Sequence, residues 1–257
     1  MGGARKTPGE EHTMKDTGPE RPLATTTEVI ERLRAIGDPK RAKASQWYFK
    51  TGPGEYGEGD VFVGIPAPTL RKLAREYGSL PLPETVSLLR SEIHEARLLA
   101  LLILVRAYGG ANAAQREEIF RLYLENTRFI NNWDLVDSSA PYIVGPHLLG
   151  RSREALRALA GSSLLWERRI AVLATFCYIK EGDFSESLRI AGALLRDPED
   201  LIHKAIGWML REIGRKDQAA EEGFLKKHYR DMPRTMLRYA IERFPENLRR
   251  QYLLGEV

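Results

Sequence analysis

Five side chains in this chain of 257 residues recur at spacings that would place them on one surface. Trp133, Arg169 and Lys204 follow one another at intervals of 36 and 35 residues, and Asp137 and Trp208 each lie four residues beyond a member of that series. Residues four apart on a helix share a face. If the interval reflects a structural repeat, these side chains converge on one groove from three successive repeats.

Such a group of side chains could break a glycosidic bond. Cleavage of a C1′–N bond builds positive charge on the sugar, which the carboxylate of Asp137 can stabilise while it orients a water molecule. The faces of Trp133 and Trp208 also attract a cation-like sugar. A base that is already cationic, such as a purine alkylated at N3 or N7, needs little general-acid help. One carboxylate without an acid partner is therefore consistent with this chemistry.

Each of these residues also has a structural interpretation, which stays open. Asp137 could cap a helix or form an ion pair with Arg169 between repeats, because an unpaired carboxylate in an apolar groove is costly. Trp133 and Trp208 could belong to the core. The occurrence of aromatic and charged side chains in the same phase of the repeat favours a functional surface.

The elements that must position these side chains are helices. Apolar residues recur with a helical period through most of the chain, and strand alternation is absent except near residues 60–64. The first helix is predicted to be capped by Thr26 or Thr27, and the second begins at Asp38-Pro39. Further helices are predicted at residues 69–77, 82–90, 94–108, 113–125, 129–138, 141–149, 153–160, 165–179, 184–196, 199–214, 217–229, 233–243 and 246–252.

A repeat is visible within this helical pattern. The segment around Arg97 resembles the segments around Arg169 and Lys204, and Trp133 falls at the intermediate position. Two helices in each period suit a HEAT-like superhelix, whereas the signature of TPR repeats is absent. We therefore predict an all-α fold, a HEAT-like α-α solenoid whose concave groove is lined by the second helix of each pair.

The chain is predicted to divide into a tail and one domain. Residues 1–25 are rich in Gly, Pro, Thr and balanced charge, so we expect a disordered tail, and residues 26–257 are predicted to form a single domain. The formal net charge of +4 therefore belongs to the domain. Four cations are predicted to contact the phosphates of a DNA duplex: Arg169, Lys204, Arg211 and Arg215.

Other residue types exclude whole classes of function. Cys177 is the single cysteine, so an internal disulfide is impossible, and a reducing compartment is expected. The histidines have no metal-ligand spacing, so we expect neither a metal nor a cofactor. The chain has no apolar run long enough for a membrane span and no signal-peptide pattern at its start, and we expect a monomer that does not bind membranes.

Two further segments are assigned structural roles. Gly52–Gly59 is rich in glycine but carries Glu55 and Glu58 and lacks the Lys-Ser/Thr of a phosphate-binding loop. We therefore predict a hairpin or an ordered connecting loop there. Side chains with the helical spacing of core residues are Phe224, Met232, Met236 and Tyr239.

Three segments resemble, in the same order, signature segments of the AlkD family of alkylpurine DNA glycosylases. They are Asn131–Gly145, which contains Trp-Asp-Leu-Val-Asp, then Trp166–Arg169, and then Lys204–Glu212. The likeness covers roughly residues 28–252. It implies that Asp137 is the catalytic carboxylate, that Trp133 and Trp208 embrace the deoxyribose and backbone of the lesion nucleotide, and that Arg169 holds the adjacent phosphate. It also implies that the lesion stays stacked instead of being flipped into a pocket.

The resemblance predicts a DNA repair hydrolase, a monofunctional glycosylase that releases 3-methyladenine and 7-methylguanine from duplex DNA in the cytoplasm, associated with the nucleoid during repair. No lysine is placed as a Schiff-base nucleophile, so no lyase activity is expected. Two features depart from the AlkD pattern: Asn132 replaces an aromatic residue, and the insertion at residues 51–60 resembles branches that bind unusual DNA structures, some of which lack glycosylase activity. The alternatives are a non-catalytic module for branched or distorted DNA and a scaffold that holds a peptide.

Overall fold

The computed structural model describes residues 24–257. The predicted disordered tail therefore lies outside the described residues except for Ala24 and Thr25, and the division of the chain at residue 26 stays a prediction. Helices make up almost all the regular structure, and the described residues form a single isolated β-bridge, between Val61 and Ile93. The all-α prediction is confirmed.

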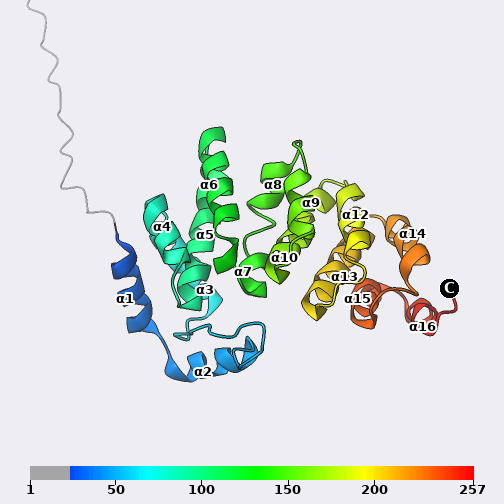
Figure 1. Ribbon diagram of the computed structural model, residues 1–257, viewed down its shortest axis with the longest axis horizontal. Helices are drawn as coiled ribbons and strands as arrows, with labels where there is room; N and C mark the ends of the chain where they lie inside the picture. The colour runs from blue at the N-terminus through cyan, green and yellow to red at the C-terminus, as the bar shows by residue number, and fades with distance from the viewer. Residues whose placement is uncertain (1–23) are drawn as a thin grey trace, which may run out of the picture.

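The helices follow one another along the whole described chain (Figure 1). They are α1 (Thr26–Ile36), α2 (Pro39–Tyr48), α3 (Ala67–Glu76), α4 (Leu82–Leu89), α5 (His94–Gly110), α6 (Ala113–Glu125), α7 (Trp133–Asp137), α8 (Val144–Leu148), α9 (Glu154–Ala160), α10 (Leu165–Ala174), α11 (Phe176–Lys180), α12 (Ser185–Ala193), α13 (Asp200–Gly214), α14 (Gln218–His228), α15 (Arg234–Ala240) and α16 (Glu246–Leu254), with 3-10 turns at Thr127–Phe129 and Ile241–Arg243.

Helix α1 begins one residue earlier than predicted. Thr25, not Thr26 or Thr27, is the cap: its hydroxyl accepts the Glu28 N–H at 3.3 Å, and the Glu28 carboxylate accepts the Thr25 N–H at 2.7 Å. Thr26 instead donates its backbone N–H to the carboxylate of Glu84 at 2.7 Å, which ties α1 to α4. Thr26 is thus the first residue of the helix and binds α4, and Thr25 caps the helix.

Two predicted helices are interrupted. The segment predicted as a helix over 129–138 is a 3-10 turn followed by α7, because Asn132 caps a new helix by accepting the Trp133 N–H at 2.8 Å. The segment predicted over 165–179 breaks at Thr175, whose hydroxyl donates to the carbonyl of Val172 at 2.7 Å.

The helices stack side by side into an array that runs from α1 at one end to α16 at the other (Figure 1). Successive inner helices α5, α7, α10, α13 and α15 contact one another, and the buried apolar residues form one continuous core. Gly207 permits the close approach of α13 and α15, since a Cβ there would lie 2.5 Å from the carbonyl oxygen of Met236. This solenoid-like stacking confirms the predicted HEAT-like architecture.

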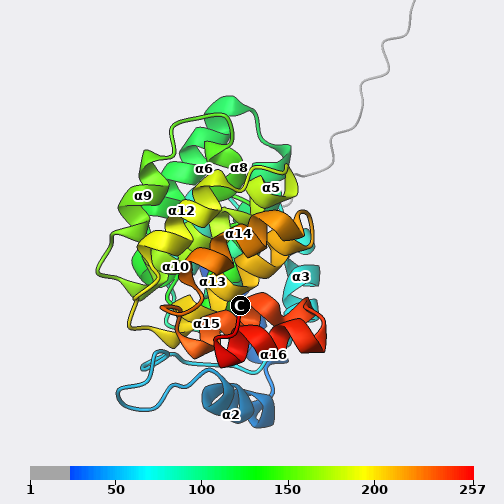
Figure 2. The ribbon, with the colours of Figure 1, turned by 90° about the vertical axis from the view of Figure 1, so that its right-hand side faces the viewer.

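Helix α2 lies apart from the array, and none of its side chains is buried (Figure 2). Its cap is Asp38, which accepts the Lys40 N–H at 2.9 Å, and Pro39 occupies the first helical position as predicted. Helices usually owe their stability to an apolar face that packs on a core. The side chains of α2 are therefore displayed mainly to solvent.

Residues 51–60 form an ordered series of turns that joins α2 to α3, not a hairpin. The acidic side chains of this loop bind its own backbone. Glu55 accepts the Gly52 N–H and Glu58 accepts the Gly54 N–H, each at 2.9 Å. These carboxylates therefore satisfy local donors that would otherwise need water.

Candidate active site

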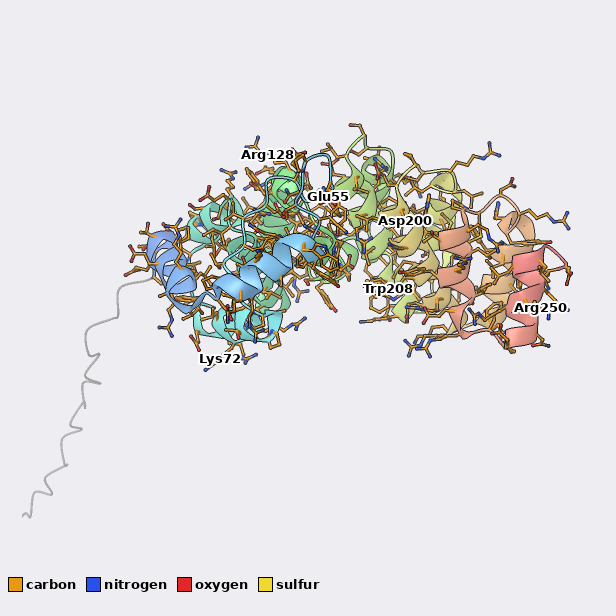
Figure 3. The ribbon with its side chains drawn as sticks, turned by 90° about the horizontal axis from the view of Figure 1, so that it is seen from below. Glu55, Lys72, Arg128, Asp200, Trp208 and Arg250 are labelled. Carbon is orange, nitrogen blue, oxygen red and sulfur yellow. The ribbon has the colours of Figure 1, made fainter. Side chains whose placement is uncertain are left out.

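The five side chains predicted from the repeat spacing line one cavity of about 410 Å³. They come from α7, α10 and α13, which are neighbours in the array. The molecule seen from below, with Trp208 of α13 labelled and α2 in front, is shown in Figure 3. The residues that line the cavity are Tyr48, Tyr56, Trp133, Asp137, Arg169, Leu201, Lys204, Trp208, Arg211 and Tyr239.

Asp137 and Arg169 form a bidentate ion pair in this cavity. Arg169 donates from Nε and Nη2 to the two carboxylate oxygens at 2.9 and 2.8 Å, and from Nη1 to the carbonyl of Leu201 at 2.6 Å. The ion pair that the sequence left open as an alternative is thus present. Arg169 is nearly covered, and its contacts are those of a residue that fixes the orientation of the Asp137 carboxylate.

The environment of Asp137 favours its neutral form more than water does. Burial raises the pKa of Asp137, and the charge and hydrogen bonds of Arg169 only partly oppose this effect. A carboxylate in a cavity with a perturbed pKa is a frequent property of catalytic sites, although ion-pair networks produce it as well. The pKa shift and the exposure of Asp137 to the cavity together mark it as the candidate for chemistry.

The two tryptophans are held in different ways. Trp133 stacks on Phe49 with ring centroids 5.3 Å apart and meets the ring of Tyr48 nearly edge-on at 6.0 Å. Trp208 donates its indole N–H to Glu212 at 3.2 Å. Both indoles are half-buried and contribute to the wall of the cavity. They therefore present aromatic surface to whatever occupies it.

The cavity lining includes some of the cations that were predicted to contact DNA, but not all of them. Lys204 lines the cavity and pairs with Asp200 at 2.8 Å, and Arg211 lines it and pairs with Glu242. Arg215 lies outside the cavity lining, where its side chain is 53% exposed and binds Glu212 at 3.0 Å. The contacts of these cations with phosphate stay predictions.

Sequence reasoning missed three tyrosines of the cavity. Tyr239 was predicted to be a core residue, but it is 37% exposed and lines the cavity. It lies one further repeat interval beyond Lys204, so the same spacing would have found it. Tyr48 and Tyr56 lie in α2 and in the 51–60 loop, which do not follow the repeat, and no signal in the sequence placed them here.

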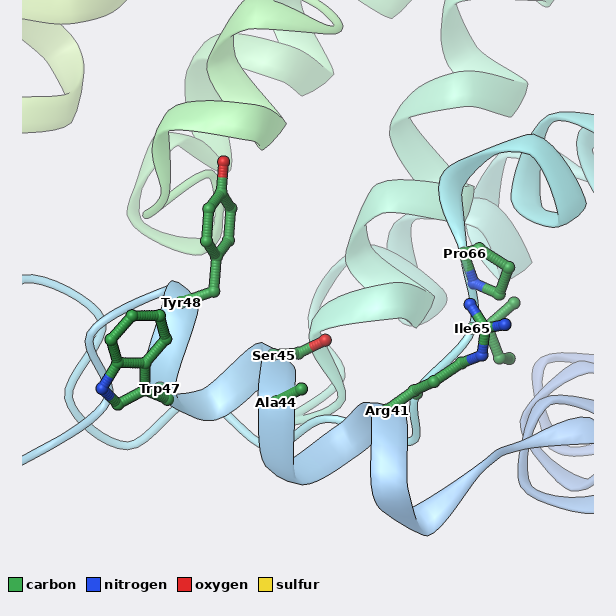
Figure 4. Close-up of a pocket in the computed structure, with 8 residues that line it drawn as sticks. Arg41, Ala44, Ser45, Trp47, Tyr48, Ile65 and Pro66 are labelled. Carbon is green, nitrogen blue, oxygen red and sulfur yellow. The ribbon is translucent and has the colours of Figure 1, made fainter.

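A second cavity lies between α2 and residues 64–66 (Figure 4). Tyr48 lines both cavities, and in Figure 4 it points away from its neighbour Trp47. The Trp47 side chain is 77% exposed. Tyr48 thus connects the exposed surface of α2 with the cavity that contains Asp137.

Asn132 explains one departure from the AlkD pattern. It is completely buried, caps α7, and donates its side-chain amide to Asp60 at 3.3 Å. An aromatic residue at this position would lack the short side-chain carbonyl that accepts the N–H of the next residue. Asn132 therefore links the end of the 51–60 loop, at Asp60, to the start of α7.

Within residues 24–257, no group of three or more His, Cys, Asp or Glu side chains is arranged to hold a metal ion. In the same range, the helices are too short or too polar to cross a membrane.

The fold and the cavity define a class of protein: a helical-repeat array with a carboxylate, an arginine and aromatic side chains in one cavity. Residues 29–244 match the family model described as DNA alkylation repair enzyme, and the chain belongs to that family. No curated protein matches the sequence.

A solved structure with a similar fold supports this assignment. A predicted DNA alkylation repair enzyme from Enterococcus faecalis superposes with a TM-score of 0.64 at 18% identity, covering 82% of this chain and 97% of the other. An AlkD2 structure from Streptococcus mutans has a TM-score of 0.49 at 16% identity and covers 86% of this chain and 100% of its own.

Proposed function

We propose that this protein is a monofunctional DNA glycosylase that hydrolyses the N-glycosidic bond of cationic N3- and N7-alkylated purines in duplex DNA. The observation that carries the proposal is the carboxylate of Asp137, fixed by two hydrogen bonds from Arg169 in the cavity that Trp133 and Trp208 line. A fixed anion that faces an aromatic cavity can stabilise a sugar cation without prior reorganisation.

In the proposed reaction, the bond between C1′ and the base nitrogen breaks and its electron pair leaves with the alkylated base, which becomes neutral. Asp137 stabilises the positive charge that develops on the sugar and orients a water molecule. The water oxygen bonds to C1′, and its proton passes to the carboxylate or to solvent. Each carboxylate oxygen keeps a further lone pair beside its bond to Arg169, so both tasks are compatible with the ion pair.

The cations of the cavity would bind the DNA backbone near the lesion. Lys204 and Arg211 are paired with Asp200 and Glu242, which are more than half exposed. Exposed ion pairs are weak and easily exchanged for phosphate contacts. Binding would therefore depend steeply on salt.

A second candidate function is non-catalytic recognition of branched or distorted DNA. The observation that favours it is the closed ion pair itself, because an aspartate that serves only to join two repeats would have the same contacts as Asp137. The two functions differ in one respect: only the first releases a base.

The deciding experiment measures the release of 7-methylguanine and 3-methyladenine from methylated duplex DNA by the wild type and by Asp137→Asn. We expect release by the wild type and almost none by the variant, with binding to the duplex preserved in both. Undiminished release by Asp137→Asn would contradict the assigned mechanism. Binding without release by the wild type would select the second function.

A further inference from the structure

A further cavity lies near the C-terminal end of the array, where α13 ends and where α14 and α16 begin (Figure 1). This C-terminal cavity has a volume of about 150 Å³, less than half that of the cavity that contains Asp137. Arg211 lines both cavities, so the two are neighbours. Arg215, which lies outside the lining of the Asp137 cavity, contributes to this smaller one instead.

The lining of the C-terminal cavity is rich in positive charge. It includes three guanidinium groups, those of Arg211, Arg215 and Arg243. Among the described residues that line it, Glu221 is the single acidic one, and the partners of Arg211 and Arg215 are Glu242 and Glu212, which do not line it. Guanidinium groups always carry charge, and their fork of N–H donors matches the oxygens of a phosphate. The cavity therefore suits a phosphate group.

Two polar atoms of the lining lack partners. Glu221 is 2% exposed, and within residues 24–257 its Oε1 atom has no hydrogen-bond partner. The Nε atom of Arg211 is also buried and unpartnered in the same part of the chain. A buried polar atom without a partner is costly, so such atoms are rare in native proteins. Their occurrence on two residues of one cavity indicates a ligand that can form hydrogen bonds.

The carboxyl group of Glu221 is mainly neutral at pH 7. Burial, with a contribution from the charge of Glu222, raises the pKa of Glu221 to about 8, and the charge of Arg211 opposes this only in part. The other groups that face Glu221 keep their charge state near neutral pH: the guanidinium groups of the cavity stay charged, and Tyr252 of α16, with a pKa of about 12, stays neutral. A protonated carboxyl group donates a hydrogen bond. Glu221 and the arginines thus all offer donors to one acceptor.

The backbone around the cavity makes room for Glu221 and adds positive potential. A Cβ on Gly214 would overlap with Oε2 of Glu221, so the carboxyl group lies against the last turn of α13. Pro245 lines the cavity and directly precedes α16, whose N-terminus has no side-chain cap. The free N–H groups in the first turn of a helix attract anions. The start of α16 therefore acts in the same direction as the arginines.

We propose that the C-terminal cavity is a phosphate-binding site, in which Arg211, Arg215 and Arg243 hold the anion and the Glu221 carboxyl group donates a hydrogen bond to one of its oxygens. This site goes beyond the proposed function, because it cleaves no bond and needs no lesion. A phosphate of the DNA backbone and a free phosphate ion share the required chemistry. The position of Arg211 between the two cavities favours a backbone phosphate.

Calorimetric titration with inorganic sulfate and phosphate at constant ionic strength tests the site. Arg243→Gln removes a cation that lines only the C-terminal cavity. Arg250→Gln is the matched control, because Arg250 is an exposed cation of α16 that lines neither cavity (Figure 3). We expect Arg243→Gln to raise both dissociation constants at least about tenfold, since it removes charge-assisted hydrogen bonds, and Arg250→Gln to change them less than about twofold. Absence of binding by the wild type, or equal affinities in the two variants, would overturn the proposal.

The pH dependence of sulfate binding tests the role of Glu221, because sulfate keeps its charge between pH 7 and pH 9. A carboxyl group with a pKa of about 8 is roughly nine-tenths protonated at pH 7 and about one-tenth protonated at pH 9. The affinity of the wild type should therefore fall about tenfold over this interval. Glu221→Gln keeps a neutral donor of similar size, so its affinity should match the wild type at pH 7 and stay the same at pH 9. A constant wild-type affinity, or an equal fall in Glu221→Gln, would overturn the assigned role of Glu221.

Binding of an unmodified duplex distinguishes the two sources of the phosphate group. The dependence of duplex affinity on salt reflects the number of phosphates that the protein binds. If a backbone phosphate occupies the cavity, Arg243→Gln should weaken duplex binding at least about fivefold and reduce the salt slope by about one, unlike Arg250→Gln. If a free phosphate ion occupies it, the two variants should bind the duplex equally while only Arg243→Gln loses sulfate. Because this duplex carries no alkylated base, a failure of base release would refute the glycosylase and leave the phosphate site standing.

Discussion

Two adjacent arginines of α10 each bind an aspartate in bidentate fashion, and they illustrate what distinguishes the candidate site. Arg169 binds Asp137 in the cavity, whereas Arg168 donates from Nε and Nη2 to Asp197 at 2.6 and 3.3 Å. Arg168 also donates to backbone carbonyls in the turn before α10, and Asp197 accepts the Glu199 N–H at 2.9 Å just before α13.

The difference lies in the surroundings and not in the ion pair. Asp197 is almost completely covered, and its carboxylate is surrounded by groups that define the connections between helices. Asp137 keeps 18% of its side chain exposed and faces a cavity with two tryptophans. The same interaction can therefore join repeats in one place and orient a reactive carboxylate in another. The pair Asp137 and Asp197 provides a matched comparison.

The two ion pairs should differ most in how strongly the rate of base release depends on their aspartates. Asp137→Asn should lower the single-turnover rate at least about 100-fold, because loss of a preorganised electrostatic group typically has an effect of this size. Asp197→Asn should stay within about twofold of the wild type. Comparable losses in both variants would indicate that Asp137 acts only through the integrity of the array.

Truncation of the aromatic wall should have an intermediate effect. Trp208→Ala should lower the rate roughly tenfold, since aromatic contacts with a nucleotide or a sugar cation contribute about 1–3 kcal/mol. Trp208→Phe, which keeps an aromatic face, should recover most of the rate. The measurement is single-turnover release on 7-methylguanine duplexes, and equal rates for Trp208→Ala and the wild type would exclude the indole from the reaction.

The pH dependence should report the raised pKa of Asp137. The reaction requires the carboxylate, so the rate should fall as pH decreases through this pKa, at a pH above the value of 3.8 for an ordinary aspartate. Asp197→Asn should retain the same profile. A wild-type rate that is constant down to the range of an ordinary aspartate would contradict the assignment.

The smallest expected effect is on stability, where Asp197→Asn should be more damaging than Asp137→Asn, the reverse of their order in base release. Asp197→Asn should lower the free energy of unfolding by about 1–3 kcal/mol, because it weakens a buried charged hydrogen bond, and the melting temperature should fall by several degrees. Asp137→Asn should lower it less. Since the pKa of Asp137 is raised on folding, its ionised form is less favourable in the folded state than in the unfolded chain, and the neutral amide avoids that penalty. Calorimetry of both variants checks the order.

The helical periodicity and the repeat interval could be read without the structure because both are local or regular properties of the chain. The interval found Trp133, Asp137, Arg169, Lys204 and Trp208, all of which line the cavity. Extended once more beyond Lys204, the interval also reaches Tyr239, which was instead predicted to be a core residue from its helical spacing, because periodicity identifies a face of a helix but not what that face meets. Arg215 was predicted for the groove on the basis of charge alone, and it lies outside the cavity lining.

By itself, the sequence determined the helices and the phase in which they present their side chains, since hydrogen bonds within a helix and contacts between equivalent repeats follow from spacing. Tertiary structure alone decided the partners of the charged residues and the path of the 51–60 loop. Asp60, His94 and Asp134 are separated by 34 and 40 residues, and no periodicity relates them. Their association depends on how the loop folds back onto the array, because the energy that selects one ion partner over another arises only when both are withdrawn from water.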